Sequence, residues 1–329
     1  MAHGAGGQKT SELIGEIFKK YFDNPHFTKD DAAVLARPEG RIAMSTDGFI
    51  VSPAFFPGGN IGELAVSGTV NDLSCMGAEP LYLTCSFIIE EGFLISDLEK
   101  IAESMADAAK EAGIEIVAGD TKVAGHGQAD GVFITTAGVG VIRDGFAPSG
   151  TQAKPGDAVL VTGDIGRHGC AILLTREEEF GISADVKSDV APLWNLVSAV
   201  RDSGAAVHTI RDATRGGVGT VLYEISEESN VGIRLDQTKI PVDPGVAGVC
   251  GMLGLDPLYL ANEGRLVIFC PKEETDTVLD ALRSRKNGEG AAVIGEVTDL
   301  NPGIVTLKTE IGSETILPKP GGELLPRIC

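Results

Sequence analysis

Five short motifs place aspartates beside small residues, at the ends of apolar runs or in expected turns. Carboxylates are hard oxygen ligands, and Mg²⁺ takes such ligands while keeping coordination positions open for phosphate oxygens. Each motif alone fits an ordinary turn or helix cap, where aspartate is common. The five together favour a site for magnesium and a phosphorylated ligand. They are Asp30-Asp31-Ala32-Ala33, Ser45-Thr46-Asp47-Gly48, Asn71-Asp72, Gly119-Asp120-Thr121-Lys122 and Asp212-Ala213-Thr214-Arg215-Gly216-Gly217.

Two further features of these motifs suit phosphate. Gly216-Gly217 precedes an expected helix over residues 218–228, and backbone N–H groups at such a turn can bind phosphate oxygens. Lys122 would place a positive charge beside a phosphoryl group. The P-loop pattern GxxxxGK[ST] and the dinucleotide pattern GxGxxG are both absent from the sequence, which argues against these two nucleotide folds.

The last residue, Cys329, is the second chemical signal. A terminal cysteine can arise by chance, but a free thiol is also a strong nucleophile that can carry an acyl group. It ends a stretch rich in proline and glycine, so it would be presented on an extended arm. The sequence therefore leaves two interpretations open, an incidental thiol and a carrier arm.

Composition narrows the class of protein. The 329 residues carry 27 Lys and Arg against 47 Asp and Glu, a net charge of −20, so a nucleic acid or an anionic membrane is not an expected partner. There is no apolar run long enough for a transmembrane helix and no signal-peptide pattern at the N-terminus. None of the six cysteines forms a CxxC pair, so free thiols and a cytoplasmic location are expected.

Strands alternate with helices in both halves, which predicts an α/β or α+β protein of two domains. We expect an N-terminal segment over residues 1–40, a first domain over 41–150, a second α/β domain over 151–311 and a mobile tail over 312–329. The patterns predict helices over residues 11–22, 61–75, 96–112, 167–175, 188–203, 218–228 and 272–285. Strands are predicted over 41–46, 81–88, 115–118, 131–142, 157–162, 205–210, 265–270, 292–297 and 304–309.

Nearly the whole chain resembles the HypE family of hydrogenase maturation proteins. The aspartate motifs alone resemble only the wider superfamily of aminoimidazole ribonucleotide synthetase, selenophosphate synthetase and thiamine-monophosphate kinase. The two ends of the chain narrow the resemblance. The matching motifs besides the aspartate ones are His3-Gly4-Ala5-Gly6-Gly7, Phe56-Pro57-Gly58-Gly59-Asn60-Ile61-Gly62, Asn262-Glu263-Gly264 and Pro326-Arg327-Ile328-Cys329.

The resemblance implies a two-domain, aminoimidazole ribonucleotide synthetase-like (PurM-like) fold that binds ATP and forms a homodimer through its N-terminal domains. It also implies ATP-dependent dehydration of a carbamoyl group on Cys329 to a thiocyanate, which supplies the cyanide ligand of a [NiFe] hydrogenase. The implied partners are the carbamoyltransferase HypF, which loads the thiol, and the HypC–HypD complex, which accepts the cyanide.

The resemblance gives roles to the residues quoted above. Glu263 would remove protons from the carbamoyl nitrogen, with Lys122 assisting, although Glu263 also fits a plain turn residue and Lys122 a phosphate counter-ion. The expected magnesium ligands are Asp30, Asp47, Asp72 and Asp212. The expected ATP site adds Asp31, Asn71, Asp120, Thr121, Thr214, Gly216 and Gly217.

Three other functions stay open at this level. A selenophosphate synthetase would need a reactive cysteine near the N-terminus, where the first cysteine is Cys75. A small-molecule kinase such as thiamine-monophosphate kinase would explain the aspartates but leave Cys329 without a role. A nucleotide-regulated scaffold would keep its partners without that thiol, so deleting Cys329 separates these functions.

Overall fold

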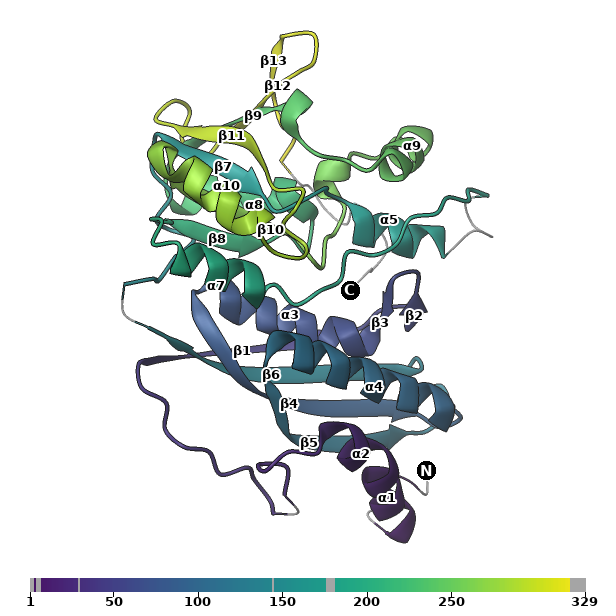
Figure 1. The fold of residues 1–329 in the computed structure, drawn as a ribbon. Coiled ribbons are helices and arrows are strands. Elements are labelled where there is room, and N and C mark those ends of the chain that lie inside the picture. The colour runs from purple at the N-terminus through teal and green to yellow at the C-terminus, as the bar shows by residue number, and fades with distance from the viewer. Residues whose placement is uncertain (1–2, 4–6, 29, 144, 176–180, 320–329) are drawn as a thin grey trace.

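The computed structural model describes residue 3 and residues 7–28, 30–143, 145–175 and 181–319. The chain forms two units, each built on its own β-sheet and stacked one above the other (Figure 1). This arrangement confirms the expected α/β or α+β fold class. In the described part of the chain, no helix combines the length and the apolar character that crossing a membrane requires.

The N-terminal unit is a four-stranded sheet with helices on one face. Its strand order is β1-β6-β4-β5, antiparallel except for the parallel pair β4 and β5, so β1 and β5 are its two edges. A short hairpin, β2 and β3, precedes the first long helix. The elements are β1 (Arg41–Phe49), β2 (Phe55–Phe56), β3 (Gly59–Asn60), α3 (Ile61–Cys75), β4 (Ala78–Glu90), α4 (Ile95–Ala112), β5 (Glu115–Ala124) and β6 (Val132–Ile142).

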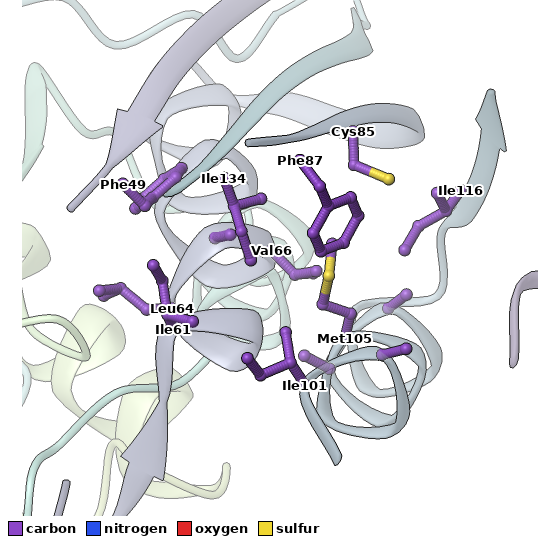
Figure 2. Close-up of a cluster of buried hydrophobic side chains, with 14 of the residues drawn as sticks. Phe49, Ile61, Leu64, Val66, Cys85, Phe87, Ile101, Met105, Ile116 and Ile134 are labelled. Atoms are coloured by element: carbon purple, nitrogen blue, oxygen red, sulfur yellow. The ribbon is translucent and has the colours of Figure 1, made fainter. Parts of the chain in front are cut away.

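Helices α3 and α4 cover the same face of this sheet, and the core lies between them. Side chains alternate along β4, so Cys85 and Phe87 point into the core while Ile88 points to the opposite, open face. Figure 2 shows Phe87 between the sheet and Met105 of α4. Burial of these apolar side chains is the main favourable contribution to folding of the unit.

The first helical segment packs beside this core. It comprises α1 (Gln8–Leu13), a π-helical turn η2 (Ile14–Phe18) and α2 (Lys19–Phe22), close to the predicted helix over 11–22. Phe18 lies against Phe87, with ring centroids 4.8 Å apart. Lys20 Nζ bonds Glu99 Oε1 of α4 at 2.6 Å, which ties the segment to the edge of the unit.

The C-terminal unit is a seven-stranded sheet of order β13-β12-β9-β11-β7-β10-β8. One face carries α7 and α10, and the other carries α8, so the sheet is buried on both faces over its central strands. The strands are β7 (Asp157–Val161), β8 (Thr209–Asp212), β9 (Gly232–Asp236), β10 (Leu266–Pro271), β11 (Ala292–Thr298), β12 (Val305–Lys308) and β13 (Glu314–Ile316). The helices are α5 (Arg167–Leu174), α7 (Trp194–Asp202), α8 (Gly217–Glu228), α9 (Pro244–Leu253), α10 (Thr275–Arg283) and the short 3₁₀ turns η3 (Gln237–Lys239), η4 (Pro257–Tyr259) and η5 (Lys272–Glu274).

Helix α3 forms much of the junction between the units, because it packs against β8 and α7 (Figure 1). Asn71 of α3 fastens this junction. Its Nδ2 donates to the backbone carbonyl oxygens of Ala191 at 3.1 Å and Glu263 at 3.4 Å, and its Oδ1 accepts from the Leu193 N–H at 2.8 Å. The buried side chain is therefore satisfied entirely by backbone groups of the other unit.

Several segments differ from the sequence prediction, and strand β9 and helix α9 were not predicted at all. The helix expected over 188–203 begins only at Trp194, because residues 188–193 run irregularly between the two units and bond to both. The tail expected from Gly312 is held as far as Lys319. β13 pairs with β12 there, Leu317 is buried, and the hydroxyls of Tyr223 and Tyr259 donate to the carbonyl oxygens of Leu317 and Pro318.

Candidate active site

An acidic cavity of about 190 Å³ opens at the junction of the two units. Strand β1 and helix α3 of the N-terminal unit supply one wall, and the turn after β8 supplies the other. Of the residues that the structure describes, four carboxylates and one cation line it. The lining residues are Thr46, Asp47, Gly48, Phe49, Gly68, Asp72, Asp212, Thr214, Arg215 and Glu263.

Regular elements hold three of these carboxylates. Asp47 lies near the end of β1, and Asp72 lies on the turn of α3 that packs over this strand, where the Ser45 hydroxyl donates to its Oδ2 at 2.6 Å. Asp212 is the last residue of β8, directly before the turn into α8. Two strands and a helix that are far apart in sequence thus bring three aspartates to one cavity.

The carboxylates raise one another's pKa. Burial is the main reason that the pKa of Asp212 rises from 3.8 to about 7, and the charge of Asp72 adds to the rise. Burial and the charge of Asp47 raise the pKa of Asp72 in the same way, although the Ser45 hydrogen bond opposes them. The cavity therefore carries negative charge that the protein's own groups do not fully offset, which is the condition a bound cation relieves.

Glu263 is the most buried acid of the cavity, with 4 % of its surface exposed. Burial, followed by the charges of Asp212 and Asp189, raises the pKa of its carboxyl well above the ordinary value. Its backbone carbonyl accepts the Asn71 hydrogen bond described above, so the residue is fixed from the N-terminal unit. A carboxylate in such a place is a strong proton acceptor once it is ionised.

The turn between β8 and α8 presents backbone to the cavity. Gly216 and Gly217 have φ values of 70° and 64°, and a Cβ on Gly217 would lie 2.5 Å from the Leu260 carbonyl oxygen. Only glycine adopts this conformation readily, so the backbone geometry favours glycine at both positions. The first N–H groups of α8 start directly after this turn, beside Thr214 and Arg215 of the lining.

Asp120, Thr121 and Lys122 lie on β5, at the sheet edge opposite to β1, and not in the acidic cavity. Lys122 Nζ bonds Asp120 at 2.8 Å, and both side chains are exposed. Lys122 is aligned with Ile88 in the parallel pair β4–β5, which places it on the open face of the sheet. The motifs of Asp47 and Asp120 thus lie at opposite edges of the same sheet.

The other expected site residues lie apart from the cavity or beyond the described chain. Asp30 and Asp31 are exposed in the irregular segment before β1. Cys329 lies outside the described residues, so its role stays a prediction. The last described residue, Lys319, pairs with Glu227 at the end of α8, and ten residues follow it.

The sequence analysis gave no role to three residues that shape the cavity. Among the described residues, Arg215 is the one cation of its lining, and it stands within a quoted motif. Asn262, fully buried, accepts the Gly166 N–H at 2.7 Å and donates to the Ala213 carbonyl oxygen at 3.0 Å. Asp189 accepts the N–H groups of Glu263 and Gly264, and its place inside a predicted helix hid it.

Asp47, Asp72 and Asp212 could supply some, but not all, of the ligands of a bound cation. Within the described ranges, no three carboxylate, imidazole or thiol side chains lie close enough to hold a metal ion alone. Mg²⁺ is commonly bound by one or two carboxylates together with substrate phosphates and water. Asp47, Asp72 and Asp212 therefore fit a magnesium ion that shares its coordination with a phosphorylated ligand.

Comparison with known proteins assigns both units. Residues 29–142 match the family model described as "AIR synthase related protein, N-terminal domain", and residues 154–308 match "AIR synthase related protein, C-terminal domain". The chain is 49% identical to "Carbamoyl dehydratase HypE" of Cupriavidus necator, over 100% of this chain and 94% of that protein.

Two solved structures extend the similarity to three dimensions. A crystal structure of the hydrogenase maturation protein HypE in complex with ATP superposes with a TM-score of 0.95 and 45% identity, over 100% of this chain and 99% of that one. A crystal structure of a HypE–HypF complex superposes with a TM-score of 0.82 and 48% identity, over 94% and 99% of the two chains.

Proposed function

The chain belongs to the HypE family of carbamoyl dehydratases, and we propose that it uses ATP to convert a carbamoyl group on Cys329 into a thiocyanate during [NiFe] hydrogenase maturation. The observation that carries the proposal is the 49% sequence identity to a carbamoyl dehydratase over the whole chain. The cluster of four carboxylates around a cavity at the unit junction supports it. A kinase or a scaffold accounts for the cavity but not for the terminal thiol.

The chemistry requires that oxygen leave the carbamoyl carbon. The carbonyl oxygen of Cys329–S–CO–NH₂ attacks the γ-phosphorus of ATP, the bond to ADP breaks, and one proton leaves the nitrogen. A second proton then leaves the nitrogen as the C–O bond breaks, so that phosphate departs and S–C≡N forms. The carbamoyl oxygen ends in phosphate, and the thiocyanate is lighter than the carbamoylated cysteine by one water.

The residues of the cavity suit these steps. Glu263 is the proposed base for the nitrogen protons, because its burial among like charges makes its carboxylate a stronger proton acceptor. Asp47, Asp72 and Asp212 would hold Mg²⁺, which when bound supplies positive charge against the phosphate oxygens. The glycine turn and Arg215 would receive the phosphate, and Thr214 lies beside them.

We also propose a homodimer, because a single chain divides the expected site between two sheet edges. Lys122 and Asp120 occupy edge β5, whereas Asp47 occupies edge β1. The open face between these edges exposes Met44 and Ile88 by 73% and 43%. A twofold pairing of each β1 with the partner's β5 would cover this face and join the two groups of residues.

Four further parts of the proposal rest on the family. HypF would load the carbamoyl group, as the HypE–HypF complex of a relative suggests. The HypC–HypD complex would accept the cyanide, and the reaction would take place in the cytoplasm. Asp30, Asp31 and Thr121 keep their expected place in the ATP site of the dimer, where a second chain would have to bring them to the cavity.

The test is the mass of the C-terminal peptide after incubation with HypF, carbamoyl phosphate and ATP. We expect Cys329 to gain a carbamoyl group and then to lose one water once the chain binds magnesium and ATP. Removal of Cys329 alone should abolish both products. A chain that phosphorylates a small molecule and leaves a carbamoylated Cys329 unchanged would show that it is a kinase and contradict the proposal.

A further inference from the structure

Asp189 is a buried carboxylate that contacts the backbone beneath Glu263. Its side chain has no exposed surface. Its Oδ1 accepts the Glu263 N–H and its Oδ2 accepts the Gly264 N–H, each at 3.2 Å. Both oxygens of one carboxylate are thus engaged by two successive peptide groups, a charge-assisted arrangement that fixes the orientation of both peptides.

The contact leaves little freedom for the chain on either side. A Cβ on Gly264 would collide with the Asp189 carbonyl oxygen, so the two backbones cross at a point where only glycine fits. The Ala191 N–H donates to the Glu263 carbonyl oxygen at 3.4 Å. The segment 189–191 therefore forms hydrogen bonds with both the backbone N–H and the backbone C=O of Glu263.

The same segment is fastened to the N-terminal unit. The Ser188 N–H donates to the Pro57 carbonyl oxygen at 2.8 Å, and Asn71 donates to the Ala191 carbonyl oxygen at 3.1 Å. Asp189 itself lies 4.0 Å from Arg265 Nε, and Arg265 in turn bonds Asp164 at 2.7 Å. The segment 188–191 thus connects the position of Glu263 to both units through contacts outside the cavity.

We propose that Asp189 is a positioning residue for the dehydration, which holds the Glu263 carboxylate in place by binding the N–H groups of Glu263 and Gly264. The inference rests on the proposed function, because it assigns Asp189 a part in the step for which Glu263 is the base. Asp189 does not line the cavity, so it acts through Glu263 and not on the substrate.

The test compares Asp189→Asn with Asp164→Asn in the full chain. Asparagine keeps the size of the side chain but has one acceptor oxygen, so one of the two N–H groups loses its partner. Misplacement of a catalytic group by about 1 Å costs on the order of 10²-fold, so we expect dehydration at saturating ATP to fall about 10- to 100-fold. The ATP dissociation constant and the carbamoylation of Cys329 should stay within about twofold.

Asp164→Asn is the matched control, because Asp164 bonds the same Arg265 but neither amide. We expect it to keep the dehydration rate within about threefold. Asp189→Glu keeps the charge and both oxygens but displaces them, so it should also slow dehydration. In a chain that carries Glu263→Gln, adding Asp189→Asn should cost little more, because both changes affect one group.

The outcomes separate the proposed function of the chain from the proposed role of Asp189. A wild-type chain that never loses water from carbamoylated Cys329 contradicts the proposed function. A wild-type chain that does so, with Asp189→Asn folded by circular dichroism and equally fast, overturns the positioning role. Equal losses in ATP affinity and turnover, or an equal loss in Asp164→Asn, would also overturn it, because they would indicate a general structural effect.

Discussion

Asp212 couples the stability of the protein to pH. Its folded pKa of about 7 exceeds its ordinary value of 3.8, so between these values the folded chain binds more protons than the unfolded chain. The contribution of Asp212 to the free energy of unfolding is therefore fully present below about pH 4 and is lost as the pH rises towards 7. Because the charged form of Asp212 destabilises the folded state, replacing it with a neutral residue should increase stability most at high pH.

We therefore expect Asp212→Asn to stabilise the ligand-free chain at pH 8, by about 1 kcal/mol or more, and to have little effect at pH 4.5. Urea unfolding in the presence of EDTA at both values measures the difference. Asp202→Asn is a suitable control, since Asp202 is exposed and pairs with the neighbouring Arg201. Equal effects of Asp212→Asn at both pH values would contradict the raised pKa.

Glu263→Gln tests the base without changing the shape of the cavity. Glutamine cannot accept the nitrogen protons, and general-base catalysis contributes about 10²- to 10⁴-fold, so the dehydration rate should fall by at least about 10². ATP affinity should be retained or improved, because one negative charge leaves the acidic cavity. Single-turnover mass analysis of Cys329 and calorimetric titration of ATP separate the two effects, and dehydration at the normal rate would rule the assignment out.

The turn into α8 has its own conformational requirement. Gly217 combines a φ of 64° with carbonyl oxygens that would lie 2.5 and 2.6 Å from a Cβ. Gly217→Ala should destabilise the fold by about 1–3 kcal/mol and weaken ATP binding through the displaced N–H groups. Gly248→Ala in α9, where a Cβ meets nothing within 4 Å, should be neutral or stabilising by up to about 1 kcal/mol. Thermal unfolding of both variants checks this, and similar shifts would contradict it.

Elements with a strong local signal could be predicted from the sequence. Helix α3 has the predicted bounds, since Asn60 caps it by accepting the Gly62 N–H at 2.8 Å. Helix α4 ends at Ala112, as predicted, and Gly113 follows in the left-handed conformation that favours glycine at the end of a helix. In both cases the residues next to the boundary determine it, so no knowledge of the rest of the fold is needed.

The segment over residues 188–193 could not be predicted in this way. Pro192 disfavours a helix through this segment, but the conformation that replaces it is set by hydrogen bonds to Pro57, Asn71 and the Glu263 loop, all distant in sequence. Asp189 was hidden for the same reason. The separation of Asp47 and Asp120 onto edges β1 and β5 could not be predicted either, because local patterns do not give the strand order.

At the scale of the whole molecule, the reach of Cys329 is shorter than the sequence suggested. Leu317 is buried, its carbonyl accepts from Tyr223 and Lys319 pairs with Glu227, so the chain is fixed in place as far as Lys319. Ten residues span at most about 33–36 Å when fully extended. The thiol can therefore serve only positions within that distance of the end of α8, whichever chain of the proposed dimer supplies them.

The proposed dimer also makes a quantitative prediction about mixed chains. If Lys122 of one chain completes the cavity of Glu263 in its partner, a Lys122→Ala chain and a Glu263→Gln chain are each inactive alone. Random mixing makes half of the dimers mixed, and each mixed dimer has one site with both residues intact, so about a quarter of wild-type activity should return.

Recovery requires subunit exchange, which size-exclusion chromatography with light scattering and a tagged chain can verify. The C-terminal mass assay then reports dehydration on the mixture. A mixture of either variant with itself is the control, because it contains no intact pair. If exchange is complete and no activity returns, Lys122 and Glu263 do not act across the two edges, and the pairing of β1 with the partner's β5 loses its functional argument.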